Sequence, residues 1–198
     1  VMRVDFESLS VEQVPIEMED MSWVVVHSGV RRELASSAFS DRVRECREGL
    51  EAVQAQSGDV LGMRGVGMHH LSALQDPWVR RLRHLVTENE RVIQASESIA
   101  KGDASKLGAL LLETHESLRS DYEVSCRELD VLVELAAAHP KCWGARMVGG
   151  GFGGCTLNLV HSAHADSFSK QIQKENWERT QREARVFSFD LVGGARID

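Results

Sequence analysis

The feature that most constrains the fold of this chain is a run of five glycines within six residues, Gly149 to Gly154. Residues 144–148 before it and 156–160 after it are rich in apolar and β-branched side chains, which is typical of strands. A backbone with so few side chains can approach a neighbouring surface closely and can turn its N–H groups toward an anion. We therefore interpret the run as a strand–strand connection that lines a site; a tight structural turn is the alternative.

The run also satisfies the spacing G-x-G-x-x-G, through Gly149, Gly151 and Gly154. In dinucleotide-binding proteins this fingerprint is followed by a helix, whose N-terminus binds the pyrophosphate. Residues 155–160 have the character of a strand instead, and no Lys-Ser or Lys-Thr pair follows as in a Walker loop. The pattern therefore excludes both of these phosphate-binding motifs.

The remaining sequence predicts strands and helices without regular alternation, which favours an α+β class. Apolar residues at three- and four-residue steps predict helices, and β-branched runs predict strands. The segment from 60 to 76 is interrupted by glycines and predicts irregular structure, with at most one short helix. We expect helices over residues 31–56, 77–100, 104–119, 126–139 and 163–176, and strands over residues 22–28, 144–148, 156–160 and 186–190.

Composition narrows the function classes. The 198 residues carry 23 Lys and Arg against 30 Asp and Glu, a net charge of −7, which argues against broad nucleic-acid binding. No apolar stretch of membrane-spanning length and no leader is visible, and the four cysteines form no C-x-x-C pair, so we expect a cytoplasmic protein with reduced thiols. His69 and His70 lack a third ligand, so no metal site is expected. The opening Val1, already in strand-like rhythm, suggests a piece of a longer protein.

Several motifs, in the same order along the chain, resemble those of galactokinases, within the GHMP group of small-molecule kinases. Residues 146–156, RMVGGGFGGCT, resemble the third signature motif of that family, R-M-T-G-G-G-F-G-G-C. Residues 29–37, GVRRELASS, resemble V-R-H-x-L-A-S-S. Residues 86–91 resemble the end of H-V-x-x-E-N-x-R, and residues 115–126, HESLRSDYEVSC, resemble S-H-x-S-L-R-D-D-Y-E-V-S-C. The matches extend over nearly the whole chain.

The resemblance implies the fold and the domain organisation. We expect the GHMP kinase C-terminal domain, a ferredoxin-like sheet with a helical layer, over residues 31–198. Residues 1–30 are expected to be the terminal strands of the N-terminal domain. Galactokinases are about twice as long, and their N-terminal half carries the sugar-binding motif, the main phosphate loop and the catalytic Asp with its Arg partner. None of these motifs is found here, so the chain alone is expected to be inactive.

The implied reaction is transfer of the ATP γ-phosphoryl group to the anomeric hydroxyl of galactose, with Mg as the metal of the complete enzyme. Gly149, Gly150, Gly151, Phe152, Gly153 and Gly154 would then support the nucleotide loop, and Gly151→Val is expected to abolish activity without unfolding the protein. Arg31 is a weak candidate at the sugar site or beside the catalytic Asp; a structural salt bridge is the alternative. Residues 115–122 are expected to pack between the domains.

Two positions depart from the family pattern. Phe39 stands where the family has a Tyr that contacts the sugar, so the hydrogen bond of that hydroxyl is lost. Val148 replaces the usual Thr beside the glycine run. The expected partners are therefore galactose or a related sugar, ATP and the N-terminal domain. A kinase for another sugar, such as N-acetylgalactosamine or arabinose, is an alternative, as is a non-catalytic sugar- or nucleotide-sensing relative.

Overall fold

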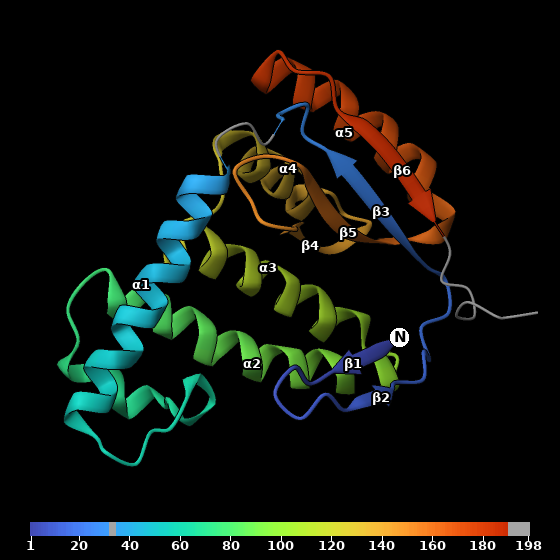
Figure 1. Ribbon diagram of the computed structural model, residues 1–198. Helices are drawn as coiled ribbons and strands as arrows, with labels where there is room; N and C mark the ends of the chain where they lie inside the picture. Colours follow the sequence, from blue (N-terminus) through green and yellow to red (C-terminus); the bar gives the residue numbers. More distant parts are fainter. Residues whose placement is uncertain (32–34, 190–198) are drawn as a thin grey trace, which may run out of the picture.

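The computed structural model describes residues 1–31 and 35–189, without the side chains of residues 35–37. Its described strands form one four-stranded antiparallel sheet, in the order β4-β5-β3-β6, and a separate two-stranded ribbon of β1 and β2 (Figure 1). The strands are β1 (Met2–Val4), β2 (Val11–Gln13), β3 (Met21–His27), β4 (Cys142–Val148), β5 (Cys155–His161) and β6 (Arg185–Phe189).

The helices agree with the predicted segments to within a few residues. The expected irregular segment from 60 to 76 contains two short 3₁₀ turns rather than one helix. The helices are α1 (Ala35–Gln56), α2 (Trp78–Ala100), α3 (Ala104–Ser120), α4 (Arg127–Ala138) and α5 (Ala165–Thr180), and the 3₁₀ turns are η1 (Met63–Gly65), η2 (Met68–Ala73) and η3 (Ser162–His164). In the described part of the chain, no helix has the length and apolar character needed to cross a membrane.

One face of the sheet packs against α4 and α5 (Figure 1). Because side chains alternate along a strand, Val24 and Val26 of β3 point to this face, where both are fully buried. They contact an apolar cluster that includes Leu132 of α4 and Phe168 and Ile172 of α5. This cluster is the main core of the domain.

On the opposite face, α3 covers β4 and β5. Two glycines allow the helix to approach the strand closely. A Cβ added to Gly108 would lie 2.2 Å from the carbonyl oxygen of Trp143, and one added to Gly144 would lie 2.0 Å from that of Gly108. Helix α2 packs on α3, and α1 packs on α2 through an apolar cluster with the 3₁₀ segment, so the helices form a layer beside the sheet.

Part of the segment before residue 30, where we expected a domain boundary, pairs with the main sheet. Residues 21–27 form β3, an inner strand of the main sheet that pairs with both β5 and β6. These residues therefore belong to the same sheet as β4 and β5. The sequence did not indicate this, because local patterns do not reveal pairing between distant strands. The β1–β2 ribbon stands apart and exposes apolar side chains, including Met2, Phe6, Leu9 and Val11. Its assignment to a preceding domain stays a proposal.

Candidate functional site

The glycine run connects β4 to β5, and a strand rather than a helix follows it, as predicted. Five of its six residues have positive φ angles, a region that side chains with a Cβ avoid. They are Gly149 (+83°), Gly151 (+84°), Phe152 (+57°), Gly153 (+123°) and Gly154 (+91°). Four of the five glycines, all except Gly150, are therefore favoured by the path of the backbone, whatever the loop binds.

The second half of the loop is anchored on both sides by backbone hydrogen bonds. The Phe152 N–H donates to the Val124 carbonyl (2.7 Å), and the Gly154 N–H donates to the Val30 carbonyl (3.2 Å). A Cβ on Gly151 would lie 2.0 Å from that Val124 oxygen, and one on Gly153 would lie 2.8 Å from Val30 Cγ1. This contradicts the expectation that Gly151→Val would spare the fold, because the clash is with the backbone.

The first half of the loop reaches the surface. Gly149 is exposed and Gly150 is half-buried, whereas Gly151, Gly153 and Gly154 are buried. Gly150 has no positive φ, and a Cβ added there would meet nothing closer than Phe39 Cδ2, at 3.9 Å. The surface available to a ligand is therefore at Gly149 and Gly150.

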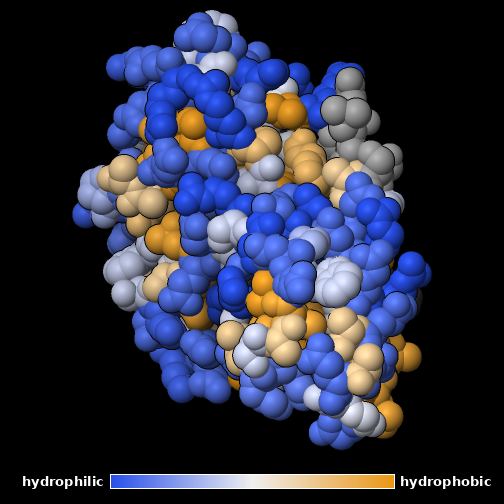
Figure 2. Space-filling model, turned by 90° about the vertical axis from the view of Figure 1, so that its left-hand side faces the viewer, coloured by the Kyte–Doolittle hydropathy of each residue, from blue (hydrophilic) through white to orange (hydrophobic). Residues whose placement is uncertain are grey.

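The predicted residues Phe39 and Arg31 lie at this end of the sheet. Phe39 is in the second turn of α1, beside Gly150, and its side chain is 40% exposed. Arg31 is exposed and follows Val30, which contacts Gly153. The start of α1 and the β4–β5 loop lie side by side (Figure 1). Residues 32–34 lie outside the described residues. Figure 2 shows the face that carries α1, where apolar patches lie among a mostly hydrophilic surface.

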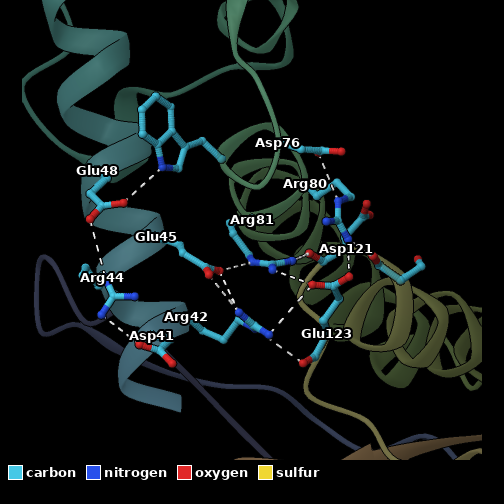
Figure 3. Close-up of polar contacts among 12 residues, drawn as sticks. Asp41, Arg42, Arg44, Glu45, Glu48, Asp76, Arg80, Arg81, Asp121 and Glu123 are labelled. Atoms are coloured by element: carbon cyan, nitrogen blue, oxygen red, sulfur yellow. Dashed lines mark hydrogen bonds and ion pairs between the residues drawn. The ribbon is translucent and has the colours of Figure 1, made fainter. Parts of the chain in front are cut away.

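A cluster of ion pairs holds the turn that contains Val124 (Figure 3). Arg81 of α2 is 2% exposed; its Nε lies 2.6 Å from Glu45 of α1 and its Nη2 lies 2.5 Å from Glu123. Arg80 also pairs with Glu123, and Arg42 of α1 lies 3.8 Å from it. Burial raises the pKa of Glu123, but the hydrogen bonds from the two α2 arginines outweigh it and keep that pKa below its ordinary value. The sequence patterns gave no indication of this cluster.

A second polar group lies under the end of β4. Arg146 Nη1 lies 3.0 Å from Glu88 Oε1, and both Arg91 and Thr114 donate to Glu88 Oε2 at 2.9 Å. Burial raises the pKa of Glu88, but these partners, led by the Arg146 charge, hold that pKa below its ordinary value. Within residues 115–122, His115 and Ser117 are buried inside the domain, whereas Glu116, Arg119 and Ser120 are exposed, so the packing of this segment between domains stays a prediction.

His84 of α2 provides a pH-dependent contribution to stability. Its Nδ1 lies 3.0 Å from Ser117 Oγ, its ring stacks on Tyr122, and burial lowers its pKa from 6.5 to about 4. The unfolded state therefore binds more protons than the folded state between these two pH values, so the free energy of unfolding rises with pH there. We expect His84→Gln to flatten this rise in urea unfolding measured from pH 4 to 6.5. The exposed His69→Gln is the control; equal slopes for wild type and His84→Gln would contradict the assignment.

No group of three or more His, Cys, Asp and Glu side chains in residues 1–31 and 35–189 is arranged to hold a metal ion. His70 Nδ1 accepts a hydrogen bond from the Gly67 N–H at 2.9 Å, so this ring has a structural partner.

Comparison with known proteins gives one consistent relationship. Residues 95–179 match the family model described as GHMP kinases C terminal. The chain is 41% identical over 198 residues to human galactokinase, covering 98% of this chain and 48% of the human protein. It is 43% identical over 169 residues to galactokinase from Chloroflexus aurantiacus, covering 83% and 43% of the two chains.

Similar solved structures agree with the relationship found by sequence. Lactococcus lactis galactokinase, in a complex with galactose, superposes with a TM-score of 0.88 at 32% identity, over 94% of this chain and 49% of that one. Mevalonate kinase from L. major shares the fold alone, with a TM-score of 0.55 at 21% identity over 95% and 46% of the two chains. The chain thus spans about half the length of the relatives it matches.

Proposed function

Because the chain belongs to the GHMP kinase family and matches the C-terminal half of galactokinases, we propose that it is part of an enzyme that phosphorylates galactose. The reaction would transfer the γ-phosphoryl group of ATP to the anomeric hydroxyl. Such transfers depend mainly on positioning of the reactants and on stabilisation of phosphate charge. Catalytic residues are not assigned to this chain, because the resemblance puts the catalytic Asp and Arg in the other half.

The observation that carries the proposal is the glycine loop. Its buried half is anchored to Val30 and Val124, while Gly149 and Gly150 face outward next to the exposed ring of Phe39. A rigid wall without side chains lets a phosphate chain approach the backbone closely. We assign the loop, including Phe152 and Gly153, to support of the nucleotide, and Phe39 to the sugar, with Arg31 as a weaker candidate beside it.

The residues beside the glycine loop fit the phosphate groups of ATP. Gly149 is exposed at the start of the loop, a Cβ at Gly150 would make only an ordinary contact with Phe39 at 3.9 Å, and Arg31 is an exposed cation next to Val30. Mg²⁺ would neutralise phosphate charge when ATP is bound. The described residues hold no group of three or more His, Cys, Asp and Glu side chains arranged for a metal ion, and we assign none of them to Mg²⁺.

The partner we propose is the N-terminal half found in the longer relatives. The β1–β2 ribbon exposes Phe6 by 84% and Leu9 by 77%, and β6 exposes Phe187 by 56%. Apolar surface of this kind is typical of interfaces. We propose that the β1–β2 ribbon contacts the N-terminal half and that its strands pair with strands of that half.

The test is a coupled assay of ADP release on the complete open reading frame that encodes this chain, with the chain alone in parallel. We expect ADP release that requires both galactose and MgATP from the complete protein, and none above background from the chain alone. EDTA is expected to abolish the activity. A complete protein that binds galactose or ATP without releasing ADP would overturn the enzyme proposal in favour of a sensing relative.

The sugar is tested in the same assay with galactose, N-acetylgalactosamine and arabinose. Phe39 favours the alternative of another sugar, since it lacks the hydroxyl that the family uses. We expect Phe39→Tyr to raise kcat/KM for galactose by up to about tenfold, the equivalent of one hydrogen bond of about 0.5–1.5 kcal/mol. If the wild type has a higher kcat/KM for N-acetylgalactosamine or arabinose than for galactose, that sugar and not galactose is the substrate.

A further inference from the structure

We propose that His115 and Asp130 form a positioning pair that holds the end of β4, and through it the outward-facing part of the glycine loop. This inference rests on the proposed function, because it takes that part of the loop to contact the nucleotide. His115 would be a positioning residue, acting through the backbone of Met147 rather than on a ligand.

The first observation is a hydrogen bond at the sheet edge. Among the described strands β4 is an edge strand, paired with β5 on one side. The N–H of Met147 donates to Nδ1 of His115 at 3.3 Å, and both residues are buried. A buried N–H without a partner costs about 1–3 kcal/mol. The imidazole of α3 therefore provides the acceptor that a further strand would otherwise supply.

The second observation is what orients the ring. Because Nδ1 accepts from Met147, the proton of the neutral ring is assigned to Nε2. Nε2 lies 3.3 Å from Oδ1 of Asp130 on α4, without the alignment of a hydrogen bond, so the carboxylate orients the ring through its attraction to the Nε2–H dipole. Ser125 Oγ donates to the same oxygen at 2.5 Å. Burial raises the pKa of Asp130, but its contacts with His115 and Ser125 outweigh this and hold that pKa below its ordinary value.

The third observation is the short path to the loop. Val148 alone separates Met147 from Gly149, the exposed start of the glycine run. The far part of the loop has its own anchors at Val124 and Val30. The near part enters from β4, where the Glu88–Arg146 pair and the His115 bond act on consecutive residues. Loss of the imidazole acceptor should therefore displace Gly149 and Gly150 more than the rest of the loop.

The test uses the complete protein and three variants. His115→Leu removes the acceptor, His115→Asn keeps an amide oxygen near the position of Nδ1, and Glu116→Gln changes the exposed neighbour on α3 as the matched control. We expect His115→Leu to raise KM for MgATP about tenfold, the equivalent of roughly one hydrogen bond, with kcat and the sugar KM little changed. His115→Asn and Glu116→Gln should stay close to wild type.

Hydrogen exchange, measured by mass spectrometry, gives a readout that does not depend on activity. Peptides covering Gly149 and Gly150 should exchange faster in His115→Leu and at the wild-type rate in His115→Asn. If His115→Leu does not fold, Asp130→Asn replaces it, with the same expected direction. If the protein is an active kinase but these variants change neither its KM for MgATP nor the hydrogen exchange of the loop, the positioning role is wrong and the proposed function stands. A wild-type protein without kinase activity overturns the proposed function, while the exchange rates still decide whether His115 holds the loop.

Discussion

Replacing Gly151 with alanine is expected to lower the free energy of unfolding of this chain by about 3 kcal/mol or more. The φ angle of +84° costs an L-residue roughly 1–2 kcal/mol. The added Cβ would lie 2.0 Å from the Val124 carbonyl oxygen, so the backbone must move. That movement weakens the hydrogen bond from the Phe152 N–H to the same oxygen, worth about 1 kcal/mol.

Gly150→Ala is the matched control, one residue away in the same loop. It has no positive φ and its Cβ would have no neighbour within 3.9 Å, so we expect a change within about 0.5 kcal/mol. Urea unfolding of both variants, compared by midpoint and slope, measures the difference. Equal midpoints for the two variants would show that the loop is not anchored as described.

Arg81→Met is expected to have an effect of similar size, about 3–5 kcal/mol, for an electrostatic reason. Arg81 is 2% exposed and pairs with both Glu45 and Glu123, so its removal leaves two carboxylates without their central cation. Glu45 keeps its ion pair with Arg42 at 2.8 Å, but its side chain is only 16% exposed, so water cannot fully replace the lost Arg81 contact. The turn that carries Val124 would loosen as a consequence.

Arg44→Met on α1 is the control for this prediction. Its side chain is 53% exposed and pairs with Asp41 and Glu48 at the surface, where an ion pair contributes about 0–1 kcal/mol. Thermal or urea unfolding of the two variants, each at low and high salt, measures the contrast. A loss at Arg81 no larger than that at Arg44 would contradict the view that the buried cluster is needed for stability.

The predicted elements were confirmed where the local pattern is strong. The helix over residues 77–100 and the strands on either side of the glycine run occur as expected, because periodicity and β-branched residues reflect burial on one face. The rejection of a dinucleotide fold was also confirmed, since β5 follows the loop directly. The resemblance to galactokinases, carried by motifs spread over the whole chain, agrees with the matches to human and Lactococcus lactis proteins.

Other features depended on contacts between distant residues. The position of β3 inside the main sheet follows from pairing with β5 and β6, more than 100 residues later in the chain, which local patterns do not reveal. The Arg81 cluster and the His115–Met147 bond likewise join different elements. A charged or imidazole side chain looks the same in the sequence whether it is solvated or buried against a partner.

The amino-acid sequence by itself determined the element types, the family and the glycine run, because these depend on local backbone preferences and on motifs. The tertiary structure alone decided which half of that run is anchored and which half faces outward. The physical reason is that Val30, Val124 and Met147 approach the loop from three separate segments. Their carbonyl and N–H groups acquire partners once the helices and the sheet have packed.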